Sequence, residues 1–232
     1  MKKKLFAVFL ALALCVSLCA CAVESDGTTA ATTSSASSST TATAASSVSS
    51  TTDGDSMFTD RDFEVGYSDY VTVTLADGAS TTSGSGVTID GDTVTVTAAG
   101  TYLFTGTLSD GQIVVNIDKS EKVQLVLDGV EITNSSSAAI YIKQADKVFL
   151  TMAEGSENTL TVSGEYVQTD TNNVDAAIFS KEDLTLNGNG TMTINAAYGH
   201  GIVSKDDLVF TSGTYNITST SHAIDGKDCV KI

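Results

Sequence analysis

The chain has 232 residues, with 12 lysine and arginine residues against 28 aspartate and glutamate residues, which gives a formal charge of −16 at pH 7. A surface this acidic repels nucleic acids and anionic lipids, so we expect no nucleic-acid partner and no direct adhesion to a membrane surface. Tryptophan and proline are absent and aromatic residues make up 6%, while threonine, serine, glycine, aspartate and valine are abundant, which favours strands and turns over helices.

Residues 1–20 are predicted to be a lipoprotein signal peptide. Three lysines at positions 2–4 precede an apolar run from Leu5 to Leu18, which is too short for a stable membrane span. The tetrad Leu18-Cys19-Ala20-Cys21 resembles the lipobox of bacterial lipoproteins, which implies cleavage before Cys21 and acylation of its thiol. An ordinary signal peptide cleaved nearby is the alternative. We therefore expect the protein on the extracellular face of the bacterial cell membrane, attached to the membrane through the lipid anchor alone.

Residues 21–56 are predicted to be a tether. Almost every residue from Thr28 to Thr52 is threonine, serine or alanine, so this segment has no large apolar side chains to bury. A coil of about 30 such residues has a root-mean-square span of roughly 30 Å, which lets the following domain stand off the membrane. Of the four cysteines, only Cys229 belongs to that domain, so we expect no intrachain disulfide.

Residues 57–232 are predicted to form one all-β domain built from repeats. After residue 86 the chain consists of short runs of alternating apolar and polar residues, each of strand length and closed by glycine, asparagine or aspartate. Four copies of one phrase occur among them: AAIYIKQADKV, AAIFSKEDL, HGIVSKDDL and HAIDGKDCV. The isoleucines of the last three copies, Ile178, Ile202 and Ile224, are 24 and 22 residues apart. The 38 residues between Ile140 and Ile178 include an extra loop around residues 165–175.

The repeat predicts a parallel β-helix with three short strands per coil. Each coil of such a solenoid stacks on the next at about 4.8 Å and buries its inward side chains against its neighbours. An antiparallel sandwich has hairpins but no reason for a fixed phrase at this period. The final coil contains Ile224 and the strand from Val230 to Ile232, and no third strand follows. We therefore expect a solenoid that is incomplete at the C-terminus, either a fragment or a chain that associates end to end.

Five longer phrases occur in order from Phe58 to the end of the chain: FTDRDFE, TVTAAGTYLFTGTLSDGQIVV, VQLVLDGVEITN, AAIFSKEDLTLNG and GIVSKDDL. Together they resemble the carbohydrate-binding β-helix family of clostridial and related cell-surface proteins. The resemblance implies a pectate-lyase-like fold, which is a right-handed single-stranded parallel β-helix, together with bound calcium and a plant polysaccharide as partner. This chain differs from the family pattern in having His200 and His222 where aspartate or asparagine is common, and in having fewer coils.

Acidic residues recur at one bend of the repeat, beside a ladder of lysines at Lys143, Lys181, Lys205 and Lys227. Calcium takes six to eight oxygen ligands, and adjacent coils bring equivalent acids close enough to share an ion. The alternative is that the acids neutralise the lysine ladder, which would otherwise repel itself at a spacing of about 5 Å. The candidate calcium ligands at this bend and in the extra loop are Asp175, Asp183, Asp206, Asp207, Asp225 and Asp228.

Sugars are usually recognised by aromatic rings that pack against the pyranose face, with polar groups around them. Tyr141 and Phe179 follow the repeat isoleucines and point outward if the isoleucines point inward, so they are a candidate stacking platform. The alternative is that the extra loop packs over both rings. His200 and His222 are expected to stack on successive coils, either in contact with carbohydrate or a metal, or as a surface ladder.

These observations favour a cell-surface lipoprotein that binds plant-type polysaccharide, either pectin and polygalacturonate or cellulose, with calcium assisting and without catalysis. Two other classes remain open: a calcium-dependent polysaccharide lyase acting by β-elimination, and a purely structural or adhesive solenoid. A lysine can serve as the base of such an elimination. A catalytic base is normally singular, however, whereas this lysine recurs in every copy of the repeat, so we predict no catalytic residue.

Overall fold

The computed structural model describes residues 58–232, which contain eighteen strands and one short 3-10 helix, η1 (Asp60–Phe63). The predicted signal peptide, Cys21 and the tether lie outside the described residues. No α-helix occurs in the described part of the chain, and none of its helices is long and apolar enough to cross a membrane. The prediction of an all-β domain is therefore confirmed.

Seven strands form one sheet, in which all pairs are parallel except the antiparallel pair at one edge. The strands in order of pairing are β17 (Ile224–Gly226), β14 (His200–Ser204), β11 (Ala176–Ser180), β8 (Ile140–Gln144), β6 (Gln112–Asn116), β4 (Thr93–Val96) and β3 (Val87–Asp90).

Eleven strands form the second sheet, which divides into two arms because its longest strand, β7 (Lys122–Asn134), pairs with two different strands along one of its sides. The first half of β7 pairs with β9 (Lys147–Met152), and its second half pairs with β10 (Glu157–Val162). One arm continues through β12 (Asp183–Gly188), β15 (Asp207–Phe210) and β18 (Cys229–Lys231), and the other through β13 (Thr191–Ala196) and β16 (Thr214–Ser219). The opposite side of β7 pairs with β5 (Gly100–Leu108), which is followed by β1 (Val71–Leu75) and the short β2 (Thr81–Thr82).

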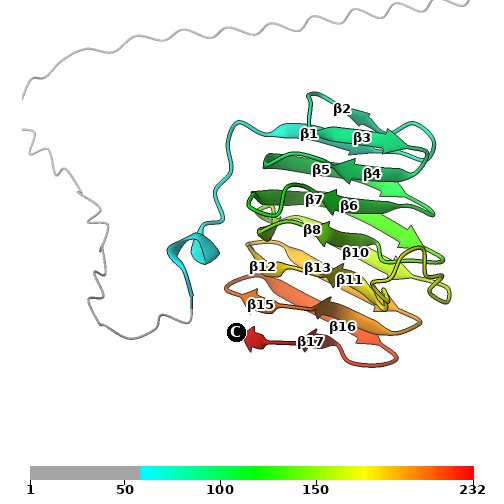
Figure 1. Ribbon diagram of the computed structural model, residues 1–232. Helices are drawn as coiled ribbons and strands as arrows, with labels where there is room; N and C mark the ends of the chain where they lie inside the picture. Colours follow the sequence, from blue (N-terminus) through cyan, green and yellow to red (C-terminus); the bar gives the residue numbers. More distant parts are fainter. Residues whose placement is uncertain (1–57) are drawn as a thin grey trace, which may run out of the picture. The chain divides into compact units, whose positions relative to one another are not determined.

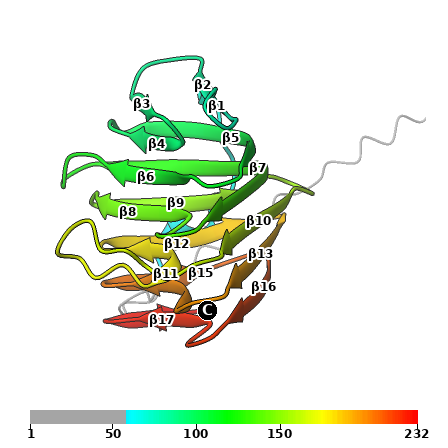
Figure 2. The same ribbon diagram turned by 90° about the vertical axis from the view of Figure 1, so that its right-hand side faces the viewer.

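From β8 onward the chain visits the seven-stranded sheet, the first arm and the second arm in turn, and then repeats this order. Figures 1 and 2 show the resulting layers of strands lying above one another, from green to red along the sequence. The predicted stacking of the four phrases is confirmed by the register, since Ile140 pairs with Ile178, Ile178 with Ile202, and Ile202 with Ile224.

One continuous apolar core lies between the sheets. The isoleucines of β8, β11 and β14 are completely buried in it, together with Leu184 and Ile194 from the two arms. Burying one such side chain contributes about 1.5–3 kcal/mol, so this core is the main source of stability.

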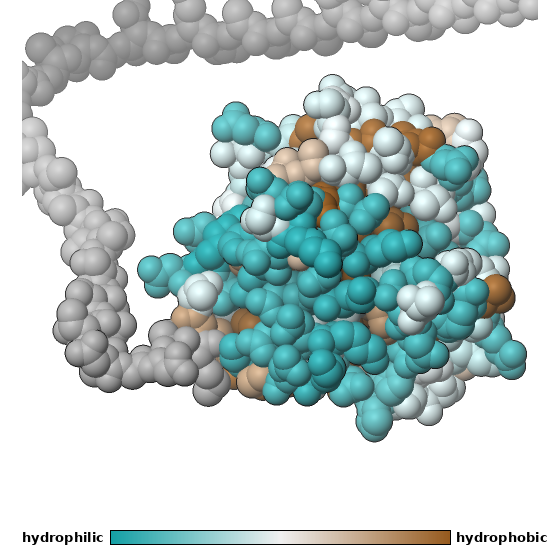
Figure 3. Space-filling model, viewed as in Figure 1, coloured by the Kyte–Doolittle hydropathy of each residue, from teal (hydrophilic) through white to brown (hydrophobic). Residues whose placement is uncertain are grey.

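The backbones of adjacent layers approach closely at the end of β12. Gly188 has a φ of 111°, and a Cβ at this position would lie 2.1 Å from the carbonyl oxygen of Met152. Outside this core, the face of the molecule seen in Figure 3 is largely hydrophilic.

Candidate functional site

The N-terminal strap, which we define as residues 58–70, packs across the outside of the first arm through a buried aspartate. The Asp62 side chain pairs with the Lys147 Nζ on β9 at 2.7 Å and accepts a hydrogen bond from the Thr185 Oγ1 on β12 at 2.6 Å. The Asp62 carbonyl oxygen accepts hydrogen bonds from Asn187 Nδ2 at 3.1 Å and Thr211 Oγ1 at 2.7 Å. The strap is therefore attached to three successive layers of the first arm.

The environment of Asp62 keeps its carboxylate charged. The residue is 1% exposed, and this burial by itself raises the pKa of the carboxyl group. Hydrogen bonds from Lys147, Thr185 and Thr59 outweigh burial and lower the pKa of Asp62 from 3.8 to about 2. At neutral pH the strap is thus held by a buried ion pair with additional hydrogen bonds, which is the arrangement in which a buried charge is tolerated.

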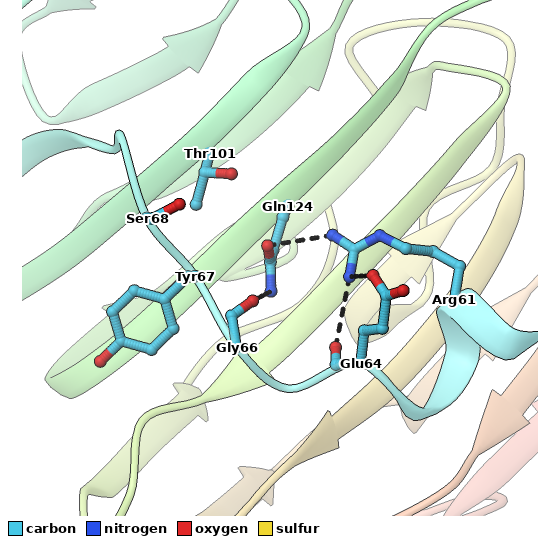
Figure 4. Close-up of a pocket in the computed structure, with 7 residues that line it drawn as sticks. All are labelled: Arg61, Glu64, Gly66, Tyr67, Ser68, Thr101 and Gln124. Carbon is cyan, nitrogen blue, oxygen red and sulfur yellow. Dashed lines mark hydrogen bonds and ion pairs between the residues drawn. The ribbon is translucent and has the colours of Figure 1, made fainter. Parts of the chain in front are cut away.

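Beyond η1 the strap crosses the outward faces of β5 and β7 and encloses a cleft of about 490 Å³ (Figure 4). An adjoining cleft of about 300 Å³ extends along the same face and shares Arg61, Thr101 and Gln124 with the first. The first cleft is lined by Arg61, Glu64, Gly66, Tyr67, Ser68, Thr101 and Gln124, and the second also by Gly100, Lys122, Val123 and Phe149.

Arg61 lies between the two clefts in a fixed orientation (Figure 4). Its Nη2 donates a hydrogen bond to Gln124 Oε1 at 3.0 Å, and its Nη1 lies 3.1 Å from the carboxylate of Glu64. The guanidinium carbon is 4.5 Å from the centre of the Phe149 ring, which adds a cation–π contact. Gln124 in turn donates to Thr151 Oγ1 at 2.9 Å. The polar groups of the cleft are thus positioned before any ligand arrives.

Tyr67, which lines the first cleft, and the nearby Tyr70 supply exposed aromatic surface on the strap. Tyr67 is 37% exposed and Tyr70 is 43% exposed, and their ring centres are 5.7 Å apart. Burial and the negative charges of Asp128 and Glu154 raise the pKa of Tyr67, so its hydroxyl is neutral and can donate a hydrogen bond. An aromatic face beside polar groups in an open cleft is the combination that sugar rings require.

Tyr141 and Phe179 lie outside the main core, as predicted, but the extra loop covers them. Phe179 is completely buried and Tyr141 is 5% exposed, and both pack against Val174 of the loop. The Tyr141 hydroxyl donates to Asp170 Oδ2 at 2.7 Å, and burial together with this bond raises the pKa of Tyr141 to about 12. The expected exposed stacking platform is therefore corrected: neither ring offers a face to a sugar, and the alternative of loop packing describes the structure.

Four of the predicted calcium ligands, Asp183, Asp206, Asp207 and Asp228, lie at the bend that leads into β12, β15 and β18, and three of them contact a nitrogen donor of the protein. Asp183 Oδ1 accepts the Asp207 backbone N–H at 3.2 Å, and Asp207 Oδ2 lies 2.6 Å from Lys231 Nζ. Asp228 lies 3.7 Å from Lys227 Nζ. Burial, and to a lesser extent the charge of Asp206, raises the pKa of Asp183. Asp207 and Asp228 therefore each pair with a lysine, as the alternative interpretation expects, but of the predicted lysine ladder only Lys227 pairs with an acid of this bend.

The remaining two predicted calcium ligands lie elsewhere and apart from this bend. Asp175, at the end of the extra loop, has a buried Oδ1 with no hydrogen-bond partner in the described part of the protein. Asp225 stands instead beside His200 and His222. The predicted stacking of these two histidines on successive layers is confirmed, since their ring centres are 5.0 Å apart and their planes differ by 31°.

The structure is thus that of an all-β protein with stacked parallel strands. Its open polar cleft, with an aromatic side chain among the lining residues, is suited to binding carbohydrate. The chain belongs to the family of carbohydrate-binding domain-containing proteins, since the model of this family matches residues 90–232. Thr101, Gln124 and Phe149 of the clefts lie inside the matched stretch, whereas the strap precedes it.

Two proteins are similar to this chain, one by sequence and one by structure. A carbohydrate-binding domain-containing protein of Acetivibrio thermocellus is 44% identical over 135 residues, which are 57% of this chain and 46% of that protein. This chain therefore spans about half the length of that relative. A solved structure of the polysaccharide lyase-like protein from C. thermocellum, a gadolinium derivative, is 35% identical, with a TM-score of 0.61 over 68% of this chain and 70% of that one.

Proposed function

We propose that this protein binds a plant-type polysaccharide, without cleaving it, in the cleft between the N-terminal strap and the outward faces of β5 and β7. The observation that carries the proposal is the cleft itself: its polar side chains are held in place by protein contacts, and one of its lining residues, Tyr67, is an exposed aromatic side chain. The family match supports carbohydrate as the class of ligand.

We also propose that the stacked strands wind as a right-handed single-stranded parallel β-helix. The parallel pairing of each layer with the next, with three strands per layer, supports this winding. Equivalent residues then recur along one face, so a chain of sugars can lie across several layers. An extended polymer is therefore the better ligand than a single sugar.

For the polysaccharide we propose pectin or polygalacturonate, with cellulose as the other candidate. Arg61 and Lys122 place two cations at the clefts of a chain that is otherwise strongly acidic, which suits a uronate carboxylate. The ion pairs of these cations with Glu64 and Asp146 limit this preference. Binding of the full chain to polygalacturonate and to cellulose, measured by affinity electrophoresis and sedimentation, separates the two candidates.

Tyr67→Ala is expected to weaken polysaccharide binding about tenfold, because an aromatic contact of about 1.4 kcal/mol corresponds to that factor. Tyr198→Ala is the matched control, since Tyr198 is 40% exposed and lies outside both clefts. Affinity electrophoresis of both variants against the preferred polysaccharide measures the effect. Equal affinities of Tyr67→Ala and the unaltered protein would place the binding site elsewhere.

We further propose that calcium assists this binding and that Asp175 is one of its ligands. A buried carboxylate oxygen without a partner is costly, and an ion with a preference for carboxylate and carbonyl oxygens removes the cost. Bound calcium would supply positive charge between an acidic chain and an acidic polymer.

Calcium is therefore expected to raise the melting temperature of the unaltered protein and of Asp228→Asn, but not that of Asp175→Asn. A bound ion at a hundredfold excess over its Kd stabilises the folded state by about 2.7 kcal/mol. Differential scanning calorimetry with calcium and with chelator measures the shift. The same increase in all three proteins would exclude Asp175 as a ligand.

We propose that Cys21 carries a lipid and holds the protein on the extracellular face of the cell membrane, on the strength of the Leu18-Cys19-Ala20-Cys21 tetrad. Two acyl chains anchor a protein firmly where one chain gives only marginal binding. Cys21→Ser is expected to move the protein from the membrane fraction to the soluble fraction on immunoblots. Retention of this variant with the membranes would show that the anchor is a different one.

A calcium-dependent lyase is the second candidate function, favoured by the similarity to a polysaccharide lyase-like protein. Three of the four repeated lysines have structural partners: Lys143 pairs with Asp170 at 3.2 Å, Lys205 lies 5.3 Å from the centre of the Phe179 ring, and Lys227 pairs with Asp228 at 3.7 Å. Incubation with polygalacturonate and calcium, followed by the absorbance of unsaturated products, decides between the two. Product formation would establish the lyase, and binding without products the non-catalytic role; an adhesive solenoid would show neither.

A further inference from the structure

Two histidines and one aspartate converge on the outside of the seven-stranded sheet. Nitrogen atoms of His200 and His222 and a carboxylate oxygen of Asp225 all lie within 4.8 Å of one another. We propose that these three side chains bind a divalent transition-metal ion, with Zn²⁺ as the best candidate. In the described part of the chain, this is the one group of three such side chains with converging ligand atoms.

The register explains why the three side chains meet on this face. Ile224 pairs with Ile202, which is part of the main core, so Asp225 next to it points to the opposite side of the sheet. Asp225 itself pairs with Val203, which belongs to the outer apolar cluster. His200 begins β14 and His222 lies just before β17, each two residues before one of the paired isoleucines, and their ring centres are 5.0 Å apart. Strict alternation would place the histidines on the side of the isoleucines. Ala176, which pairs with His200, belongs to the outer apolar cluster, so the alternation is interrupted here and the histidines lie on the side of Asp225.

The chemistry of the three ligands selects the type of metal. Calcium and magnesium take oxygen ligands, whereas imidazole nitrogen suits zinc, copper and nickel. Two histidines with one carboxylate are a ligand set found around zinc, with the remaining position open to water or another donor. This site therefore differs in chemistry from the calcium site proposed at Asp175.

The ligand atoms are close to the separation that zinc needs. In a tetrahedral site with zinc–ligand distances of about 2.0–2.1 Å, neighbouring ligand atoms are about 3.3 Å apart. The present separations are at most 4.8 Å, and because His222 is exposed and the other two residues are only partly buried, their side chains have room to rotate toward a shared ion.

The backbone around the site is fixed, and the bonds that metal binding would displace are weak. Gly201 N–H donates to the His222 carbonyl oxygen at 3.0 Å, which holds the two strands in register. The His200 ring contacts Ser221 Oγ at 3.4 Å and the His222 backbone N–H at 3.3 Å. Both distances are at the long end of the hydrogen-bond range, so exchanging these contacts for a metal bond costs little.

The same positions in the preceding layer carry no ligands. Ala176 pairs with His200, and Phe179 pairs with Val203, the partner of Asp225. Ala176 and Phe179 are completely buried in the cluster beneath the extra loop. Beyond the extra loop, the chain has two imidazoles and a carboxylate at positions where the preceding layer has small or apolar residues. Neither the repeat nor the packing of the core requires these polar side chains.

Titration of the full chain with Zn²⁺ alone, in buffer with excess calcium, tests the proposal by isothermal calorimetry. We expect one equivalent of zinc to bind in spite of the calcium, and His222→Ala and Asp225→Asn each to weaken this binding at least tenfold. Asp228→Asn and Cys229→Ser are the controls and should bind as the unaltered protein does. Circular dichroism checks that the variants keep their strand content.

The visible spectrum of bound Co²⁺, used in place of zinc, should change when either histidine is replaced. Absence of zinc binding by the unaltered protein would overturn the proposal. The proposal is also overturned if His200→Ala and His222→Ala bind zinc as well as the unaltered protein, or if only Cys229→Ser loses the ion. None of these outcomes depends on polysaccharide binding.

Discussion

Asp62→Ala is expected to lower the free energy of unfolding by about 3–5 kcal/mol, because it leaves the ammonium group of Lys147 buried without its carboxylate. The Lys147 side chain is only 11% exposed, so its ammonium group is poorly solvated once the carboxylate is gone. Urea denaturation followed by circular dichroism measures the change. Asp60→Ala is the matched control: Asp60 lies in the same turn but is exposed, so its replacement should change stability by less than about 0.5 kcal/mol.

The stability difference between the unaltered protein and Asp62→Ala should depend on pH, which distinguishes loss of the ion pair from a general loss of packing. A carboxyl group whose pKa is lowered on folding stabilises the protein above its unfolded pKa, and this stabilisation is lost as the pH falls towards the folded pKa. For Asp62 this window runs from 3.8 down to about 2, and the shift corresponds to roughly 2 kcal/mol. The difference between the unaltered protein and Asp62→Ala should therefore shrink across this window. A difference independent of pH would contradict the ion pair.

Asp62 also connects stability to the proposed function. Arg61 and Tyr67 line the cleft because the strap that carries them lies against the first arm. Asp62 holds the strap there through its bonds to Thr185 and Asn187. We therefore expect Asp62→Ala to bind polysaccharide more weakly, as Tyr67→Ala does, although Asp62 lines neither cleft. Unchanged affinity in Asp62→Ala would show that the strap is not needed as a wall of the site.

The strands and their pairing could be predicted from the sequence because they repeat. The phrase around Ile178 returns at Ile202 and Ile224, and a repeated phrase buries its apolar residues only when the copies stack in register. The extra loop around residues 165–175 was also visible as an interruption of the period. Alternation correctly placed Tyr141 and Phe179 outside the main core. It could not predict the path of the loop that covers them, because a loop has no period.

The strap and its cleft could not be predicted because they occur once. Asp62 and Thr185 are 123 residues apart, and Arg61 and Gln124 are 63 residues apart, so no local pattern relates them. One local signal was present: Thr59 and Asp62 have the spacing of a capping box, and both of its reciprocal bonds are formed. This signal predicts the turn η1 but not the sheet against which it packs.

Ile178→Ala is expected to lower the free energy of unfolding by about 2–5 kcal/mol, the usual cost of removing a large aliphatic side chain from a rigid core. Ile178 is completely buried and pairs with Ile140 on one side and Ile202 on the other, so neither neighbouring layer can close the cavity without moving its own strands. Urea denaturation of the variant, compared with the unaltered protein, measures the loss.

Ile224→Ala is the matched control for this prediction, since it makes the same chemical change at the same position of the repeat. Ile224 is only partly buried and packs at the margin of the core, so part of its side chain already contacts water. We expect its replacement to cost about 1 kcal/mol, because less apolar surface is lost and no closed cavity forms. Equal losses at both positions would mean that the two layers are packed alike, which would contradict the difference in burial on which the prediction depends.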